Sequence, residues 1–247
     1  MYEIKNQIIK FVKDYVDASG AKGVVLGMSG GKDSFVVAKI CTDAIGKENV
    51  FGLIMPRGDQ KEDVKIAIDE CELLGIKHTI ADISKLYDET VALSKAAVET
   101  NELSKVSTLN ISPRLRMNLL YAVGGTLGYL VANTSNLSER MVGYSTKWGD
   151  GVGDFAPLLG LTKSEVCELG IALGLPEKYV NKKPADGLTG KTDEEVMGFS
   201  YDELDNFIRN GKISKNHEKI LKMHKGSSHK RQNMAYFDSK RKNYFEN

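Results

Sequence analysis

A glycine-rich turn lies between a short apolar run and a helix-length stretch near the start of the sequence. Residues 24–28 are too few for a helix and rich in β-branched side chains, whereas residues 33–45 have the length of a helix. Glycines let the backbone approach a ligand closely, and the free amides at a helix start attract anions. The sequence therefore predicts a phosphate-binding turn made of Gly27, Met28, Ser29, Gly30, Gly31, Lys32, Asp33 and Ser34.

The same alternation of short apolar runs and longer segments continues along the chain. Further buried strands are predicted at residues 50–55, 78–81 and 129–132. Helices are predicted at residues 61–74, 84–98 and 113–127, after an opening amphipathic helix that ends near Gly20. This pattern indicates an α/β fold with a doubly wound parallel sheet and helices on both faces.

Beyond residue 133 no further strand is predicted, and the chain becomes helical. Three pairs have the spacing of a capping box, in which a hydroxyl and a carboxylate cap a helix start: Thr162 with Glu165, Thr192 with Glu195, and Ser200 with Glu203. Residues 181–191 are expected to form a mobile loop, and the tail from residue 212 is basic. We expect one domain over residues 1–247, with an α/β core (1–160) and a helical elaboration (161–247).

Composition excludes several partners and compartments. The 34 basic residues nearly balance the 33 acidic ones, so no whole-molecule field favours nucleic acid or membrane binding. The first 14 residues have an amphipathic pattern without the apolar core expected of a signal peptide, and no apolar run of about 18 residues that could span a bilayer occurs in the sequence. Its cysteines, Cys41, Cys71 and Cys167, are too widely spaced for a zinc site and fit a reducing cytoplasm.

Two common phosphate-binding motifs can be excluded at the turn by their spacing. The P-loop motif requires Ser or Thr after its lysine, but Lys32 is followed by Asp33. The dinucleotide fingerprint GxGxxG has no match here, which disfavours hydride transfer from a nicotinamide cofactor. What remains, SGGKDS at residues 29–34, resembles the pyrophosphate loop of the ATP pyrophosphatases, which have the adenine nucleotide alpha hydrolase-like fold and cleave ATP between its α and β phosphates.

Further motifs select one branch of that superfamily. In chain order they are PRLRM (113–117), TSNLSE (134–139), TKWGDGVGD (146–154), PLLGLTK (157–163), PADGL (184–188), TDEE (192–195), GFSYDELD (198–205) and HKR (229–231). Together they resemble the NAD synthetase family over nearly the whole chain. The resemblance implies that ATP adenylates the nicotinate carboxylate of deamido-NAD, that ammonia then displaces AMP, and that the protein is a homodimer with deamido-NAD bound across the interface.

The resemblance also implies roles for individual residues. The Mg²⁺ ligands would be Asp33 and Glu139, and the catalytic residues would be Asp150, which would hold ammonia, and Lys163. ATP would contact the turn, Thr134, Lys163 and Ala185, the last through its backbone only, because the family often carries a hydroxyl there. Deamido-NAD would contact Arg114, Lys147, Asp154, His229 and Lys230, with Arg116 and Ser29 in support.

Several of these residues also have a simpler structural interpretation. Asp33 could merely cap the helix it opens, and an isolated acid such as Glu139 is more often a solvated surface residue. We expect Trp148 to serve in packing rather than in stacking on substrate. Because Arg114 and Arg116 are two apart on a predicted helix, they cannot share one face.

Two other functions are compatible with a phosphate-binding turn of this kind. A tRNA-modifying ligase of the same superfamily would predict a CxxC pair or a basic appendage, and neither is present. A non-catalytic nucleotide sensor is disfavoured because the acids Asp33, Glu139 and Asp150 occur together with Lys163. The length leaves no room for an amidotransferase domain, so free ammonia is the expected donor unless a separate glutaminase supplies it.

Overall fold

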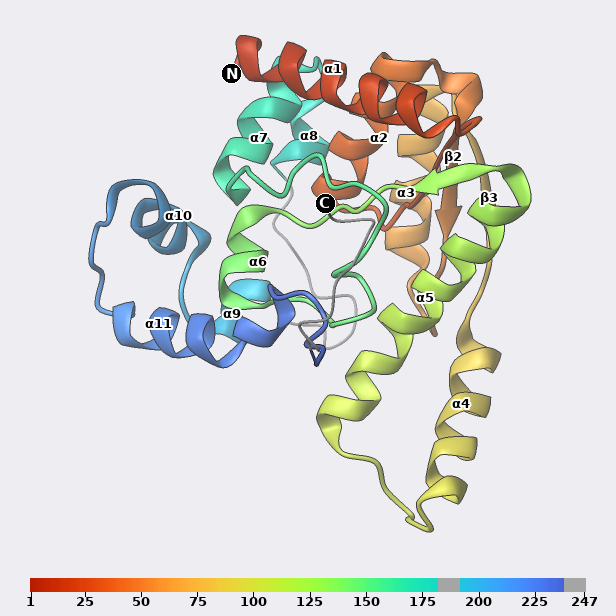
Figure 1. Ribbon diagram of the computed structural model, residues 1–247, viewed down its shortest axis with the longest axis vertical. Coiled ribbons are helices and arrows are strands. Elements are labelled where there is room, and N and C mark those ends of the chain that lie inside the picture. The colour runs from red at the N-terminus through yellow and green to blue at the C-terminus, as the bar shows by residue number, and fades with distance from the viewer. Residues whose placement is uncertain (182–191, 238–247) are drawn as a thin grey trace.

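The computed structural model describes residues 1–181 and 192–237, and it contains a sheet of four parallel strands (Figure 1). The strands occur in the order β3-β2-β1-β4 across the sheet. Their bounds are β1 (Gly23–Gly27), β2 (Val50–Ile54), β3 (Lys77–Ile80) and β4 (Tyr129–Val131). The predicted parallel α/β sheet is confirmed. The expected ATP contact at Ala185 lies outside the described residues.

Helices connect and flank these strands. Around the sheet lie α1 (Tyr2–Ser19), α2 (Lys32–Ile45), α3 (Lys61–Leu74) and α5 (Lys105–Leu127), with the 3-10 turn η1 (Lys47–Asn49), and α4 (Ser84–Ala97) pairs with α5. The later part contains α6 (Leu137–Val142), α7 (Lys163–Ala172), α8 (Glu177–Val180), α9 (Asp193–Met197), α10 (Tyr201–Asn210), α11 (His217–Gly226) and the 3-10 turn η2 (Ser228–Lys230). No helix in these described ranges is long and apolar enough to cross a bilayer.

Alternating side chains of β1 fill the two faces of the sheet. Val24 and Leu26 lie in the larger core cluster, to which α1, α2, α3 and α7 contribute. Val25 points the other way and packs with Met117 and Leu120 of α5. Because successive residues of a strand face opposite sides, this alternation means that helices cover both faces of the sheet, as predicted.

Three local predictions need correction. The strand β3 was expected to be buried, but it is an edge strand whose Ile80 is 48% exposed. The helix α5 was expected to begin at Pro113, but it begins at the cap residue Ser104, whose hydroxyl accepts a hydrogen bond from Ser107 N at 3.1 Å. The short helix α6 was not predicted at all. In each case tertiary context or a local cap outweighs the sequence signal.

A third apolar cluster joins the later helices to α6. Its buried members include Val142 of α6, Met197, Leu204 of α10 and Ile220 of α11. By contrast, Val166 of α7 lies in the main core. Apolar contacts therefore connect residues before position 160 with residues after it. The division into a core and a helical elaboration stays a prediction.

Candidate active site

The glycine-rich turn lies at the carboxyl end of β1, where α/β sheets bind their ligands. Gly30 has φ of +70°, and a β-carbon there would lie 2.5 Å from the backbone oxygen of Asp63, so only glycine fits. Gly31 is the N-cap of α2, and Ser34 Oγ donates to its carbonyl at 2.8 Å. The turn thus presents the start of α2 to a cavity, as the anion-binding prediction requires.

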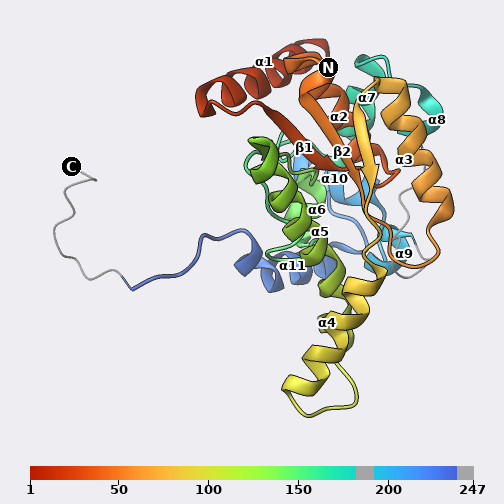
Figure 2. The same cartoon turned by 90° about the vertical axis from the view of Figure 1, so that its right-hand side faces the viewer.

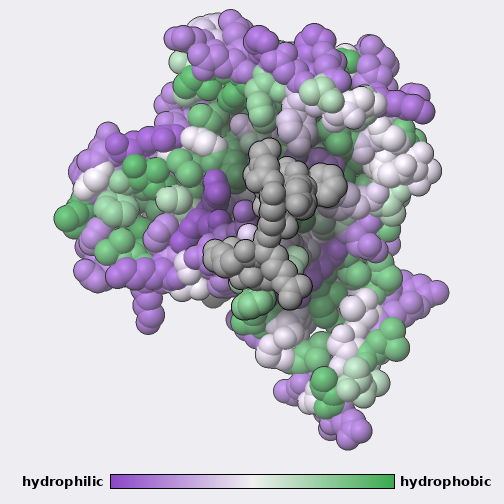
Figure 3. All heavy atoms as spheres, in the orientation of Figure 1, coloured by the Kyte–Doolittle hydropathy of each residue, from purple (hydrophilic) through white to green (hydrophobic). Residues whose placement is uncertain are grey.

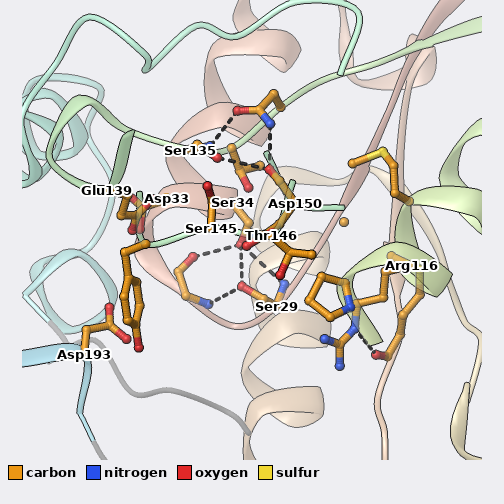
Figure 4. A pocket seen from close by; sticks show the side chains of 18 of the residues that line it. Ser29, Asp33, Ser34, Arg116, Ser135, Glu139, Ser145, Thr146, Asp150 and Asp193 are labelled. Carbon is orange, nitrogen blue, oxygen red and sulfur yellow. Dashed lines mark hydrogen bonds between the residues drawn. The ribbon is translucent and has the colours of Figure 1, made fainter. Parts of the chain in front are cut away.

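That cavity has a volume of about 860 Å³ and gathers most of the predicted site. Figure 4 shows Asp33 and Glu139 side by side, with Asp150 and Thr146 between them and Arg116. The predicted residues that line the cavity are Gly27, Met28, Ser29, Gly30, Gly31, Lys32, Asp33, Ser34, Arg116, Thr134, Glu139, Asp150, Lys163 and Lys230.

At one end of the cavity Lys163 is enclosed by two carboxylates. Its Nζ lies 2.6 Å from Asp33 Oδ2 and 3.0 Å from Glu139 Oε1, and its side chain is 6% exposed. Burial disfavours its charge, but the two carboxylates outweigh burial and raise the pKa of Lys163 above its usual value. Burial also raises the pKa of Glu139, with Asp33 adding to the shift and Lys163 opposing it. Glu139 is therefore no solvated surface acid.

The residue that connects these two acids is Asn136, which the sequence reasoning missed. Its side-chain oxygen accepts from Glu139 N at 3.0 Å and so caps α6, while its Nδ2 donates to Asp33 Oδ1 at 3.0 Å. Glu139 Oε2 accepts from Asn136 N in return, which completes a capping box. The Asn-x-x-Glu spacing was a usable signal for this cap, because asparagine caps helices as well as serine does.

The carboxylate of Asp150 is a further acid of the cavity lining. Its Oδ1 accepts a hydrogen bond from Thr146 N at 2.6 Å. Burial raises the pKa of Asp150 above its usual value, and the opposing effects of Thr146, Lys230 and Arg116 do not cancel the shift. Asn133 holds this loop by donating through Nδ2 to Asp150 O at 2.8 Å. The sequence analysis did not identify Asn133.

Most of the predicted deamido-NAD contacts lie outside the lining of the cavity. Lys230 reaches the cavity, where Nζ donates to Gly143 O at 2.7 Å and to Ser145 O at 2.6 Å. The cavity lining does not include Arg114, Lys147, Asp154 or His229. Asp154 instead accepts a hydrogen bond from Val131 N at 2.7 Å, and His229 is exposed.

Two expectations about neighbouring residues have opposite outcomes. Arg116 Nε donates to Met55 O at 2.9 Å, whereas Arg114 Nε donates to Lys147 O at 3.3 Å, so the arginines do occupy different faces of α5. The packing role expected for Trp148 is wrong, because its side chain is 53% exposed and its backbone has φ of +62°. A left-handed backbone is unusual for a bulky residue and is held by the glycine-rich loop around it.

Comparison with known proteins agrees with this geometry. The family model for NAD synthase matches residues 4–243. An ammonia-dependent NAD synthetase of Finegoldia magna is 40% identical over 238 residues, which is 96% of each chain. Among solved structures, an NMN synthetase from Francisella tularensis has a TM-score of 0.88 at 34% identity, covering 96% of this chain and 98% of its own. An ammonia-dependent NAD synthetase from Campylobacter jejuni has a TM-score of 0.77 at 29% identity, with the same coverage. The chain belongs to the NAD synthase family.

Proposed function

We propose that this chain is an ammonia-dependent NAD synthetase that adenylates the nicotinate carboxylate of deamido-NAD with ATP and then amidates it with ammonia. The observation that carries the proposal is the placement of Lys163, Asp33 and Glu139 beside the phosphate-binding turn in one cavity. The relatives named as ammonia-dependent NAD synthetases support the same reaction.

The order of the two steps follows from carbonyl chemistry. A carboxylate resists ammonia because its negative charge repels nucleophiles and its oxygen is a poor leaving group. Attack of that carboxylate on the α phosphate of ATP releases pyrophosphate and converts the oxygen into part of a good leaving group, AMP. The amides at the start of α2 would hold the phosphates, and Lys163 would offset the charge that develops as pyrophosphate leaves.

The donor set fits a magnesium ion. Asp33 and Glu139 supply hard carboxylate oxygens at the cavity wall, and Mg²⁺ is commonly held by one or two carboxylates plus substrate phosphates and water. In residues 1–181 and 192–237 no three His, Cys, Asp or Glu side chains lie together as a metal site. Phosphate oxygens of the substrate would therefore complete the coordination shell of the magnesium ion. When bound, the ion would neutralise phosphate charge during the transfer.

Asp150 would serve the second step. A carboxylate that lines a cavity can hold an ammonium ion by charge and hydrogen bonding and accept a proton as the neutral amine attacks. The hydrogen bond from Thr146 N fixes the direction of that carboxylate, and its pKa is raised, which favours its acceptance of a proton.

We further propose that two copies assemble through the hairpin of α4 and α5, which projects from the body of the molecule (Figure 2). No residue of α4 is buried in the described chain. Figure 3 shows hydrophobic atoms on the surface of the hairpin. Its exposed large apolar residues include Leu93 at 72%, Val98 at 65% and Val106 at 68%. A partner copy would cover this apolar surface.

The free thiols of all three cysteines support a reducing compartment, the cytoplasm.

A second acceptor, nicotinic acid mononucleotide, is favoured by one specific observation. The Francisella tularensis NMN synthetase superimposes with a higher TM-score, 0.88, than the Campylobacter jejuni NAD synthetase, 0.77. The mononucleotide offers the same nicotinate carboxylate without the adenylate half, so the same two steps would convert it into NMN. Comparing kcat/KM for the two acceptors at equal ATP and ammonium decides between them.

The reaction class is tested by identifying the products. The protein is incubated with ATP, Mg²⁺, ammonium and either acceptor, and the nucleotide and phosphate products are separated. AMP plus pyrophosphate, formed only when an acceptor is present, supports the proposal. Formation of ADP plus orthophosphate refutes it.

A further inference from the structure

A buried carboxylate outside the cavity, Asp205 of α10, bonds to the starts of two other helices. It is 6% exposed, and its Oδ1 accepts a hydrogen bond from Ser138 Oγ of α6. Its Oδ2 accepts from Ser164 N at 2.8 Å and from Ser164 Oγ at 2.7 Å, both in the first turn of α7. One side chain thus links the first turns of α6 and α7.

Both serines are sequence neighbours of site residues. Ser138 directly precedes Glu139, and Ser164 directly follows Lys163. A third contact connects the starts of α6 and α7 directly, because Lys163 N donates to Ser138 Oγ at 3.0 Å. The first two amides of α7 are therefore satisfied by Asp205, one directly and one through Ser138. The relative position of the two helix starts depends on this carboxylate.

The same face of α10 also meets the head group of Lys163. Tyr201 precedes Asp205 by one helical turn, and residues four apart lie on one face of a helix. The Lys163 ammonium is 5.1 Å from the centroid of the Tyr201 ring. Tyr201 is fixed in turn, since its hydroxyl donates to Asp193 Oδ2 at 3.0 Å. Thus α10 supports Lys163 both at its backbone and at its charged end.

We propose that Asp205 is a positioning residue that sets the separation of Glu139 and Lys163 and thereby the rate of adenylation. This inference rests on the roles proposed above for those two residues. Reaction rates depend steeply on the placement of charged groups around the reacting atoms, so a shift of α6 against α7 would slow pyrophosphate release. A carboxylate at a helix start also stabilises the helix, which is the simpler role to be separated by experiment.

The chain offers a matched control for that separation. Arg209 lies one turn after Asp205 on α10 and also binds the first turn of α7, where its Nε donates to Glu165 Oε1 at 2.7 Å. Arg209 has no contact with Ser138 or α6 among its described hydrogen bonds. Arg209→Ala therefore loosens α10 from α7 without breaking the bridge between α6 and α7.

The test compares Asp205→Asn with Arg209→Ala. Asparagine keeps the shape but has only one acceptor oxygen and no charge, so it can accept from only one of the two serines, and its amide makes a weaker bond to the other. We expect Asp205→Asn to slow pyrophosphate release by about tenfold to a hundredfold with an unchanged KM for ammonium. Arg209→Ala should keep the rate within about twofold, while thermal unfolding reports the stability lost by each variant. Equal effects of the two variants, or full pyrophosphate release by Asp205→Asn, overturn the proposal.

Two further measurements keep the test decisive. If Asp205→Asn does not fold, Ser138→Ala is measured instead, because it removes the bridge between α6 and α7 but leaves the contact of Asp205 with α7. We expect Ser138→Ala to slow pyrophosphate release. An unchanged rate overturns the proposal. A crystal structure of the variant measures the distance from Lys163 Nζ to Glu139 Oε1, now 3.0 Å. A longer distance supports the inference and an unchanged one overturns it. The measured distance tests the positioning role of Asp205 even if the wild type makes no pyrophosphate with either acceptor. That outcome would refute the proposed function alone.

Discussion

The ammonium of Lys163 lies 2.6 Å from the carboxylate of Asp33, although the two residues are 130 positions apart in the sequence. Lys163 is the first residue of α7 and Asp33 lies in the first turn of α2, so the contact joins the phosphate-binding turn to the later half of the chain. Glu139 completes the group from α6. This arrangement holds the two acids together before any nucleotide binds, because the ammonium offsets their mutual repulsion.

Replacing Lys163 by Met should destabilise the protein by about 2 kcal/mol, because it leaves two shielded carboxylates without their cation. The loss is smaller than for a fully buried pair because Glu139, whose pKa is raised, can take up a proton. Urea unfolding measures the change, and added Mg²⁺ should restore part of it. The control is Lys10→Met, which breaks an exposed pair with Asp14 and should change stability by less than about 0.5 kcal/mol. Equal losses in both variants would contradict this account.

Asp150→Asn should make the protein more stable at pH 8 and slower in amidation. The folded-state pKa of Asp150 is raised, so the folded protein binds the proton more tightly than the unfolded chain does. The contribution of Asp150 to stability is therefore full at low pH and is lost as the pH rises through the raised pKa. The gain in melting temperature should appear above that pKa and vanish below it, and a gain that is independent of pH would exclude this cause.

The three thiols should differ in reactivity. Burial raises the pKa of Cys41 to about 12, and burial together with Glu70 and Glu72 raises that of Cys71 to about 12. Cys167 is partly exposed and lies 3.4 Å from Lys32 Nζ. In the native protein a maleimide should label Cys167 alone, as read by mass spectrometry of peptides. Rapid labelling of all three thiols would show that the core cysteines are accessible.

Leu93→Lys should convert the proposed dimer into monomers, because it places a charge in the apolar surface of the hairpin. Sedimentation velocity at several concentrations measures the assembly state. Ile213→Lys is the control, since Ile213 is comparably exposed at 71% but lies away from the hairpin. A monomeric wild type, or a variant that assembles as the wild type does, would refute the interface.

Much of the fold could be read from the chain because its strands carry strong local signals. The run that becomes β1 is apolar, β-branched and followed by glycines, so strand, turn and helix were all predicted. The helix α5 was misjudged because Pro113 normally marks a helix start, whereas here the Ser104 cap begins the helix earlier and Pro113 lies inside it. The exposure of β3 could not be predicted, because it depends on which strand lies at the edge of the sheet.

The sequence predicted candidate members of the site but not the contacts between them. The resemblance of the motifs to the NAD synthetase family pointed to Asp33, Glu139 and Lys163, yet no sequence signal states that one lysine binds both acids. Those contacts depend on how α6 and α7 pack against the turn, which is a tertiary property. Asn136 and Asp205 were missed for the same reason, since each acts by linking segments that are far apart in sequence.

Measuring the two half-reactions separately in three variants distinguishes the residues that serve adenylation from the residue that serves amidation. Pyrophosphate release, measured with acceptor but without ammonium, reports adenylation, and NAD formation with ammonium reports the whole reaction. We expect Asp33→Asn and Lys163→Ala to lower pyrophosphate release about a hundredfold, because each removes charge from the phosphate end of the cavity. Asp150→Asn should leave that release nearly unchanged and slow NAD formation. Equal, small effects of all three substitutions on both steps would contradict the assignment of Lys163 and its two carboxylates to adenylation.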